Sequence, residues 1–309
     1  MRGLLIAFGL VSWAAAGSAL AQSACSAHEL QRLAPRGVTV LAAKSVPAGG
    51  KLPVHCLVDA NVATPGNVVD FRLGLPSSWN RKLLFIGVGG FAGSMGRLEL
   101  GLERGYATAT TDTGHHGSSG TDAGWALDHR PKEIDYGHRG THVSVVASRQ
   151  LTRAYYGANP KYAYFNGCSN GGRQALMEAQ RYPDDFDGII AGAPSFGALG
   201  YLRRAVTYQQ LLASSDRVLP LEKIYVLSKA ITAACDASDG VVDGLVGDPR
   251  LCSFDPQVLR CKRSDAPDCL TQGQIEAIAI LHSDTILPTG QRLRGMPLGH
   301  EWRDTGWPL

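Results

Sequence analysis

The sequence predicts an α/β fold in which a largely parallel β-sheet is covered by helices. An apolar run of strand length occupies residues 82–88. A second strand pattern at 105–111 is followed by a helical pattern at 141–155, and a third at 162–165 runs towards the good helix formers of 173–179. Strands that alternate with helices in this way form βαβ units, which build parallel sheets.

The first 21 residues have the pattern of a secretory signal peptide. A positive charge at Arg2 precedes the apolar run 4–16, and Ala19-Leu20-Ala21 forms a small-x-small cleavage site before Gln22. This run is too short for a membrane anchor, and no later stretch reaches the apolar length that spans a bilayer. We therefore expect a secreted or periplasmic protein without a membrane partner.

Export makes the seven cysteines informative, because thiols in an oxidising compartment form disulfides. Pairing cysteines that are close in the sequence predicts three bridges, Cys25–Cys56, Cys235–Cys252 and Cys261–Cys269. Cys168 is then left unpaired in this chain.

Composition and charge exclude some classes of function. The chain has 309 residues, of which 44% are hydrophobic, so it is long enough for one sizeable domain or a domain with a large insertion. A net charge of +3, scattered along the chain, is too small to indicate binding to nucleic acid or to an anionic membrane surface.

The segment after the signal peptide is expected to form short strands and turns. Runs rich in β-formers at 37–41, 54–58 and 67–73 are separated by Pro and Gly. The buried strand 82–88 then leads into Gly89-Gly90. A glycine-rich loop after an early strand is either a plain turn or a place where a backbone N–H points at a developing oxyanion.

The helix expected at 141–155 has its apolar residues on one face, formed by Val143, Val146, Ala147, Leu151 and Ala154. Four histidines near it are conceivable catalytic bases: His115, His116, His138 and His142. We expect them instead to be hydrogen-bonded locally, because the triad order of hydrolases of this type places the histidine after the serine.

The stretch Gly167-Cys168-Ser169-Asn170-Gly171 matches the G-x-S-x-G pattern of a nucleophile elbow. In such an elbow a tight turn between strand and helix exposes a serine hydroxyl. The flanking glycines are required because a Cβ there would collide with the neighbouring strand or helix. The pattern alone also fits a glycine-rich turn that happens to contain a serine.

Several long motifs together resemble the tannase and feruloyl esterase family, which includes the hydrolase of mono(2-hydroxyethyl) terephthalate. They lie, in the family's order, at 79–93, 111–115, 167–173 and 178–194. The resemblance implies an α/β-hydrolase core at 22–200, with a lid domain inserted after the elbow half that occupies 201–309 and is incomplete. It also implies hydrolysis of esters of aromatic acids, and feruloyl, galloyl and terephthaloyl esters all fit it.

The resemblance also assigns roles to residues of the elbow. Ser169 would be the acylated nucleophile, and the backbone N–H groups of Asn170 and Gly90 would form the oxyanion hole. Cys168 matches a family cysteine that is bridged to a second cysteine beside the catalytic histidine. That cysteine, the triad histidine and the triad aspartate are expected beyond residue 309, so we expect this chain to be an incomplete and poorly active carboxylic ester hydrolase. The alternative is a non-catalytic homologue or pseudoenzyme that binds aromatic ligands.

An acidic motif follows the helical stretch 201–231, in which residues 219–223 mark a helix start. By spacing alone, the carboxylates of Asp236, Asp239 and Asp243 form either a solvated turn or a loop around a hard cation. The resemblance implies a structural Ca²⁺ site, to which Val241 and Leu245 would contribute main-chain carbonyls. A further helix is expected after the N-cap residue Thr271.

Overall fold

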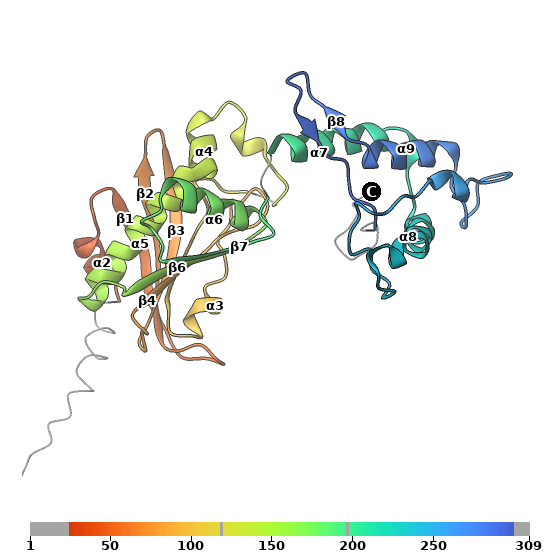
Figure 1. The fold of residues 1–309 in the computed structure, drawn as a ribbon. Helices are drawn as coiled ribbons and strands as arrows, with labels where there is room; N and C mark the ends of the chain where they lie inside the picture. Colours follow the sequence, from red (N-terminus) through yellow and green to blue (C-terminus); the bar gives the residue numbers. More distant parts are fainter. Residues whose placement is uncertain (1–24, 118–119, 196–197, 300–309) are drawn as a thin grey trace, which may run out of the picture. The chain divides into compact units, whose positions relative to one another are not determined.

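The computed structural model describes residues 25–117, 120–195 and 198–299, and the predicted signal peptide at 1–21 lies outside them. The chain divides into two compact units, the first ending at Phe196 and the second beginning at Gly197. Figure 1 shows a sheet with helices in the first unit and mostly helices in the second.

The described part of the first unit contains a seven-stranded mixed sheet in the order β1-β2-β3-β5-β4-β6-β7. The strands are β1 (Val38–Val46), β2 (His55–Thr64), β3 (Asn67–Pro76), β4 (Lys82–Ile86), β5 (Ala107–Thr111), β6 (Tyr162–Cys168) and β7 (Gly188–Gly192). Strands β1, β2, β3 and β5 pair antiparallel, whereas β5, β4, β6 and β7 pair in parallel. The predicted class, a parallel-rich sheet with flanking helices, is confirmed.

The first two strands are longer than expected, because β1 and β2 pair from Val38 opposite Val62 to Val46 opposite His55, with an irregularity between Val40 and Ala42. The paired segments include polar residues as well as β-formers. Runs of β-formers in the sequence therefore underestimate the length of these strands.

Three helices cover one face of the sheet (Figure 1): α2 (Ala27–Leu33), α5 (Gly140–Tyr156) and α6 (Asn170–Arg181). Shorter elements lie in the connections: α3 (Glu99–Leu102), η1 (Gly124–Ala126), α4 (Arg130–Ile134) and the π-helical turn η2 (Asp135–Arg139). The short helix α2 was not predicted, although Ser26 caps it by accepting a hydrogen bond from the N–H of Glu29.

Helix α5 agrees with the prediction in its bounds and only partly in its buried face, since Ala147 and Leu151 are buried as predicted. Val143 and Val146 are only half-buried, while Val145 is fully buried and shares its face with three small hydroxyl residues, Ser144, Ser148 and Thr152. The Oγ of Ser144 lies 2.8 Å from the carbonyl oxygen of Gly140 and 3.0 Å from the Oγ1 of Thr111. A hydroxyl that is hydrogen-bonded in this way can be buried, and a search for apolar residues misses it. The hydroxyls of Ser148 and Thr152 are also buried, but they have no hydrogen-bond partner among the described residues.

The register of the parallel strands places their carboxyl ends at one edge of the sheet. Ile86 of β4 lies opposite Asn166 of β6, and Cys168 of β6 lies opposite Gly192 of β7. The core below this edge contains stacked Phe85 and Phe165. The loops that follow β4, β5, β6 and β7 therefore emerge together, which is where open α/β sheets bind their ligands.

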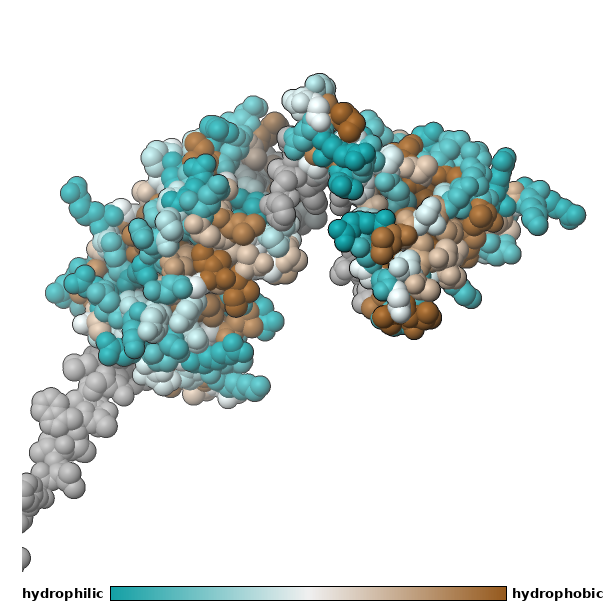
Figure 2. All heavy atoms as spheres, in the orientation of Figure 1, coloured by the Kyte–Doolittle hydropathy of each residue, from teal (hydrophilic) through white to brown (hydrophobic). Residues whose placement is uncertain are grey.

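Strand β7 is the last strand of the described sheet on its side. Its Ile190 is 64% exposed, and Figure 2 shows a brown patch over this region of the first unit. An apolar edge strand is a place where further chain can pair.

The second unit is built on a core that contains Leu219, Leu227, Ile231 and Leu270. Its described elements are α7 (Ala198–Leu212), η3 (Ser215–Arg217), α8 (Leu221–Cys235), η4 (Asp236–Asp239), η5 (Pro256–Leu259), α9 (Gln272–His282), β8 (Thr285–Ile286) and β9 (Arg292–Leu293). The helical stretch predicted at 201–231 is thus two helices, because Pro220 disfavours helical backbone before it and then serves as the N-cap of α8.

Two further predictions for the second unit are confirmed. Helix α8 begins within 219–223, and Thr271 caps α9 in a capping box with Gln274.

All three predicted disulfides are present: Cys25–Cys56, Cys235–Cys252 and Cys261–Cys269. Cys168 is a free, exposed thiol. Among the residues that the structure describes, no helix is long and apolar enough to cross a membrane.

Candidate active site

Ser169 occupies a sharp turn between β6 and α6. Its backbone has φ 58° and ψ −119°, a conformation that residues with a Cβ rarely adopt. Three hydrogen bonds of 3.0 Å hold this turn: its N–H donates to Gly192 O, and its carbonyl oxygen accepts from the N–H groups of Arg173 and Ser195. The strained turn is therefore determined by its surroundings, as strained residues at functional sites are.

The glycines around Ser169 allow close backbone contacts. A Cβ on Gly167 would overlap the carbonyl group of Gly171, and a Cβ on Gly171 would lie 3.1 Å from the carbonyl carbon of Gly87. The first contact closes the turn onto the start of α6, and the second brings α6 against the loop after β4. The predicted reason for the flanking glycines agrees with these contacts.

The side chain of Ser169 is exposed at the carboxyl edge of the sheet. Its Oγ lies 3.3 Å from the Oγ of Ser195, in the loop after β7. Among the described residues, Ser195 is the hydrogen-bond partner of this hydroxyl, and no histidine is bonded to it. Ser195 was not identified from the sequence, because its closeness to Ser169 depends on the pairing of β6 with β7.

The loop after β4 is attached to β6 and α6 by three hydrogen bonds. The N–H of Gly87 donates to Asn166 O (2.9 Å), and the N–H of Val88 donates to Gln174 Oε1 (3.0 Å). The Asn170 side-chain amide in turn donates to Val88 O (2.9 Å). The two segments predicted to form the oxyanion hole are thus held side by side. One is the loop that leads to Gly90, and the other is the start of α6 at Asn170.

Gly90 and Asn170 have backbone features that suit N–H donors. Asn170 is the first residue of α6, and the first N–H groups of a helix have no partner within the helix. Gly90 has φ +57°, and a Cβ there would overlap the carbonyl group of Gly120, whereas Gly89 has open space around it. Of the two loop glycines, Gly90 is the one whose conformation requires glycine.

Tyr136 and Arg173 stabilise the same corner, and no sequence pattern pointed to Tyr136. The hydroxyl of Tyr136 lies 3.0 Å from Asn170 Oδ1 and 3.4 Å from Gly90 O, so it spans both segments. Arg173 donates to Asn170 Oδ1 and to the carbonyl oxygens of Tyr136 and Gly137, and its guanidinium lies over the Tyr136 ring at 4.5 Å. Burial lowers the pKa of Arg173 from its usual value.

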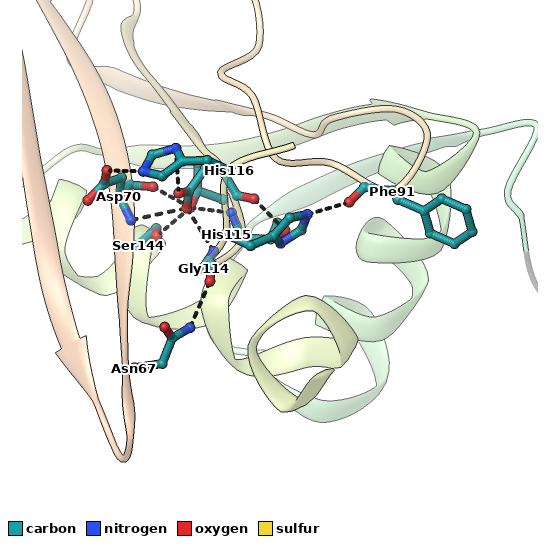
Figure 3. A network of polar contacts seen from close by, with 10 residues as sticks. Asn67, Asp70, Phe91, Gly114, His115, His116 and Ser144 are labelled. Atoms are coloured by element: carbon teal, nitrogen blue, oxygen red, sulfur yellow. Dashed lines mark hydrogen bonds and ion pairs between the residues drawn. The ribbon is translucent and has the colours of Figure 1, made fainter. Parts of the chain in front are cut away.

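The turn after β5 supports the loop from its other side (Figure 3). The buried carboxylate of Asp112 accepts from the N–H groups of Asp70 and Gly114, and the ring Nε2 of His115 lies 2.7 Å from Phe91 O. Burial lowers the pKa of His115 to about 4, so at neutral pH the ring is neutral and its Nε2–H donates to Phe91. Burial raises the pKa of Asp112 to about 7.

The four histidines considered as bases are all engaged elsewhere. His115 is buried and stacked on Trp125 at 3.7 Å, and His116 faces the carboxylate of Asp70 at 3.4 Å. The Nδ1 of His138 contacts the hydroxyl of Tyr182, and the Nδ1 of His142 contacts Asp185. His115, His138 and His142 are hydrogen-bonded to nearby groups, as expected, whereas the contacts given for His116 are ion pairs with Asp70 and Asp112. His115 lies in the interior and not on a surface.

The acidic loop of the second unit is exposed and organised by its own carboxylates. Asp236 accepts from the N–H groups of Asp243 and Gly244, and Asp239 accepts from those of Val241 and Gly247. Asp243 accepts from the N–H of Leu245. Three carboxylates with nearby carbonyls are a donor set that suits Ca²⁺. The three carboxylates do not converge, however: the groups of ligand atoms within 4.8 Å of one another, in the described part of the chain, lie elsewhere.

Comparisons with known proteins agree with this arrangement. The family model for tannase and feruloyl esterase matches residues 56–302. An uncharacterized esterase of Xanthomonas campestris pv. campestris is 37% identical over 296 residues, covering 89% of this chain and 50% of that protein. A probable feruloyl esterase B-1 of Aspergillus flavus is 32% identical over 235 residues, covering 74% and 44% of the two chains.

Solved structures show the same fold. The crystal structure of feruloyl esterase B from Aspergillus oryzae matches with a TM-score of 0.81 at 27% identity, covering 91% of this chain and 60% of that one. The tannin acyl hydrolase from Aspergillus niger, at 23% identity and a TM-score of 0.66, shares the fold. The chain spans about half the length of the curated relatives it matches. With an α/β-hydrolase-type sheet and a family match over most of its length, the chain belongs to the tannase and feruloyl esterase family.

Proposed function

We propose that this protein acts as an exported serine carboxylesterase on esters of aromatic acids, with Ser169 as the nucleophile. The observation that carries the proposal is the backbone of Ser169, held at φ 58° with its side chain exposed at the start of α6. A plain turn would not require a strained serine between Gly167, where a Cβ would overlap the backbone, and Gly171, where a Cβ would be tightly packed.

In the proposed reaction, the Oγ of Ser169 attacks the ester carbonyl carbon, and its proton passes to a general base. The carbonyl oxygen becomes an oxyanion that accepts hydrogen bonds from the N–H groups of Asn170 and Gly90. Such donors contribute roughly 3 kcal/mol each, because they face the charge that develops and need no reorganisation. The alcohol leaves with a proton returned by the base, and water then cleaves the acyl-enzyme.

The base and its acid partner are proposed to follow residue 309 in the longer protein, together with a cysteine that pairs with Cys168. Two observations support this proposal: the chain spans about half the length of its relatives, and the thiol next to Ser169 is free and exposed. Export is supported by the three disulfides, because such bonds persist in oxidising compartments.

The test is covalent labelling of Ser169 by a fluorophosphonate probe, combined with hydrolysis of methyl ferulate, methyl gallate and a terephthalate monoester. The chain is compared with a longer form that includes the sequence after residue 309. We expect labelling and hydrolysis in the longer form, loss of both in Ser169→Ala, and retention in Ser195→Ala. The proposal is refuted if the Ser169→Ala variant of the longer form hydrolyses these esters as well as the unsubstituted longer form does.

A second candidate function is non-catalytic binding of aromatic ligands by the 309-residue chain. It is favoured by one observation, the contact of Ser169 Oγ with Ser195 and not with a histidine. Ligand binding without labelling of Ser169, in both chain lengths, would support this function over the esterase.

We further propose that Asp236, Asp239 and Asp243, with the carbonyl groups of Val241 and Leu245, hold a structural Ca²⁺ ion. The donor chemistry supports it, and binding requires the carboxylates to turn inward from their N–H partners. Ca²⁺ should raise the melting temperature of the protein, and it should not do so in Asp239→Asn. As a control, Asp248→Asn, which changes a nearby half-buried aspartate outside the proposed ligand set, should leave the increase with Ca²⁺ as large as in the native protein.

A further inference from the structure

The C-terminal half of α6 contributes to a second polar cluster, which the esterase chemistry does not use. It consists of His142 from α5, Glu178 from α6 and Asp185 from the loop after α6, and is called here the Glu178 cluster. One ligand atom from each residue lies within 4.8 Å of the others. Glu178 is completely buried and Asp185 is 8% exposed, while the side chain of His142 remains 30% exposed.

The charges of this cluster are not balanced by the side chains around it. The Nδ1 of His142 lies 2.6 Å from Asp185 Oδ2, but neither carboxylate oxygen of Glu178 has a hydrogen-bond partner among the described residues. The neighbouring Arg149 donates to the carbonyl oxygen of Asp184 and not to a carboxylate. Two buried carboxylates beside one imidazole are costly unless a proton or a cation joins them.

The imidazole of the cluster is held in place by an aromatic neighbour. The His142 ring stacks on Tyr182 with a centroid distance of 3.8 Å and an interplanar angle of 8°. The Tyr182 hydroxyl in turn lies 2.7 Å from the Nδ1 of His138. The cluster therefore has a fixed nitrogen donor, two buried oxygen donors and an opening at the exposed part of His142.

We propose that His142, Glu178 and Asp185 bind a divalent transition-metal ion, represented by Zn²⁺. A mixed set of one imidazole and two carboxylates suits such ions, whereas Ca²⁺ and Mg²⁺ prefer oxygen donors alone. The ion would join α5, α6 and the loop at 182–187. Glu178 lies nine positions after Ser169 along the helix, roughly 13 Å at 1.5 Å per residue, so the ion would have a structural role.

Isothermal titration of the EDTA-treated full chain with ZnCl₂, in excess CaCl₂ to saturate the acidic loop, tests the proposal. We expect one tight site in the native protein. In Glu178→Gln and in His142→Asn the affinity should fall by more than about 100-fold, because losing even an outer partner of a metal ligand costs about 10–100-fold. Zn²⁺ should also raise the melting temperature of the native protein alone.

The matched control is His116→Asn, which alters the other group of three ligating residues, Asp70, Asp112 and His116. This variant should bind Zn²⁺ like the native protein. The proposal is overturned if the native protein binds no Zn²⁺, if both cluster variants bind it equally well, or if His116→Asn removes the binding. If the native protein binds no Zn²⁺, or if both cluster variants bind it equally well, Glu178 is neutralised by a proton and not by a metal ion. None of these readouts depends on esterase activity.

Discussion

Each end of α6 contains an energetically unfavourable feature, which lies in the backbone at one end and in a side chain at the other. At the N-terminal end the polar side chains are well bonded, with Asn170 and Arg173 making several hydrogen bonds each, and the cost is in the backbone of Ser169. At the C-terminal end the backbone is regular, and Tyr182 caps the helix by donating to Glu178 O. There the cost is in the side chain of Glu178, a buried carboxyl without a partner among the described residues.

The two functions proposed for this helix follow this difference. A strained backbone that its surroundings hold in place presents a reactive side chain outwards, as expected for a nucleophile. A buried carboxyl whose backbone is relaxed presents nothing outwards, and it must be neutralised from within by a proton or an ion. The two ends should therefore respond to different perturbations.

The largest effect on stability is expected from Gly167→Ala, which adds a methyl group at the turn before the N-terminal end of α6. The new Cβ would overlap the carbonyl group of Gly171, so β6 and α6 must separate. We expect the free energy of unfolding of the first unit to fall by about 3 kcal/mol or more, as for overpacking against rigid backbone. Urea unfolding monitored by circular dichroism measures this change.

Gly192→Ala on the paired strand β7 is the matched control. The atom nearest to its Cβ would be 3.5 Å away, an ordinary contact, so the change in stability should be small. Equal losses in the two variants would show that the turn at Ser169 does not depend on the close approach at Gly167.

A smaller effect is expected from Glu178→Gln at the C-terminal end, and its sign depends on pH. Burial, and then the charge of Asp185, raise the pKa of Glu178 from 4.5 to about 9. Between these values the folded state keeps a proton that the unfolded state releases, so this group makes the native protein less stable as the pH rises. The glutamine cannot titrate.

The measurement is urea unfolding in EDTA at several pH values. The stability of Glu178→Gln relative to the native protein should increase by about 2 kcal/mol over a rise of about 1.5 pH units, since each unit of differential protonation is worth roughly 1.4 kcal/mol. Glu133→Gln, on helix α4 with a side chain that is 39% exposed, should show no such trend. A constant difference across the pH range would mean that Glu178 is already ionised in the folded protein.

The sequence predicted those parts of the molecule that local chemistry determines. The strand, the glycines and the helix around Ser169 follow from propensities and from a five-residue pattern, and Thr271 was identified as a cap from its own position. The three disulfides followed from separations of 8 to 31 residues. Each of these features depends mainly on neighbours along the chain.

What the sequence did not reveal depends on contacts between distant segments. Tyr136 reaches Asn170 across 34 positions, and no local pattern marks it. Glu178 is an ordinary helix former in the sequence, and only packing against α5 and the 182–187 loop makes it a buried charge. The part of the buried face of α5 that was not predicted has the same origin, because Ser148 and Thr152 are buried despite their hydroxyl groups.

The smallest effect, and the sharpest test of the comparison, comes from removing one hydroxyl at each end of α6. Tyr136→Phe removes the group that spans Asn170 and Gly90 at the N-terminal end. A hydrogen bond of this kind stabilises by about 1 kcal/mol. Amide hydrogen exchange in a peptide spanning 87–93, measured by mass spectrometry, should therefore become roughly fivefold faster if local opening limits exchange.

Tyr182→Phe removes the hydroxyl that contacts His138 and keeps the ring that stacks on His142. Amide exchange of Tyr182→Phe in the same 87–93 peptide should match that of the native protein. The loop after β4 is attached to Asn166 of β6 and to Asn170 and Gln174 of α6, and not to the C-terminal end of the helix. If the two variants accelerate exchange equally, the ends of α6 are coupled. The N-terminal end with Ser169 and the C-terminal end with Glu178 would then not respond independently, as we infer that they do.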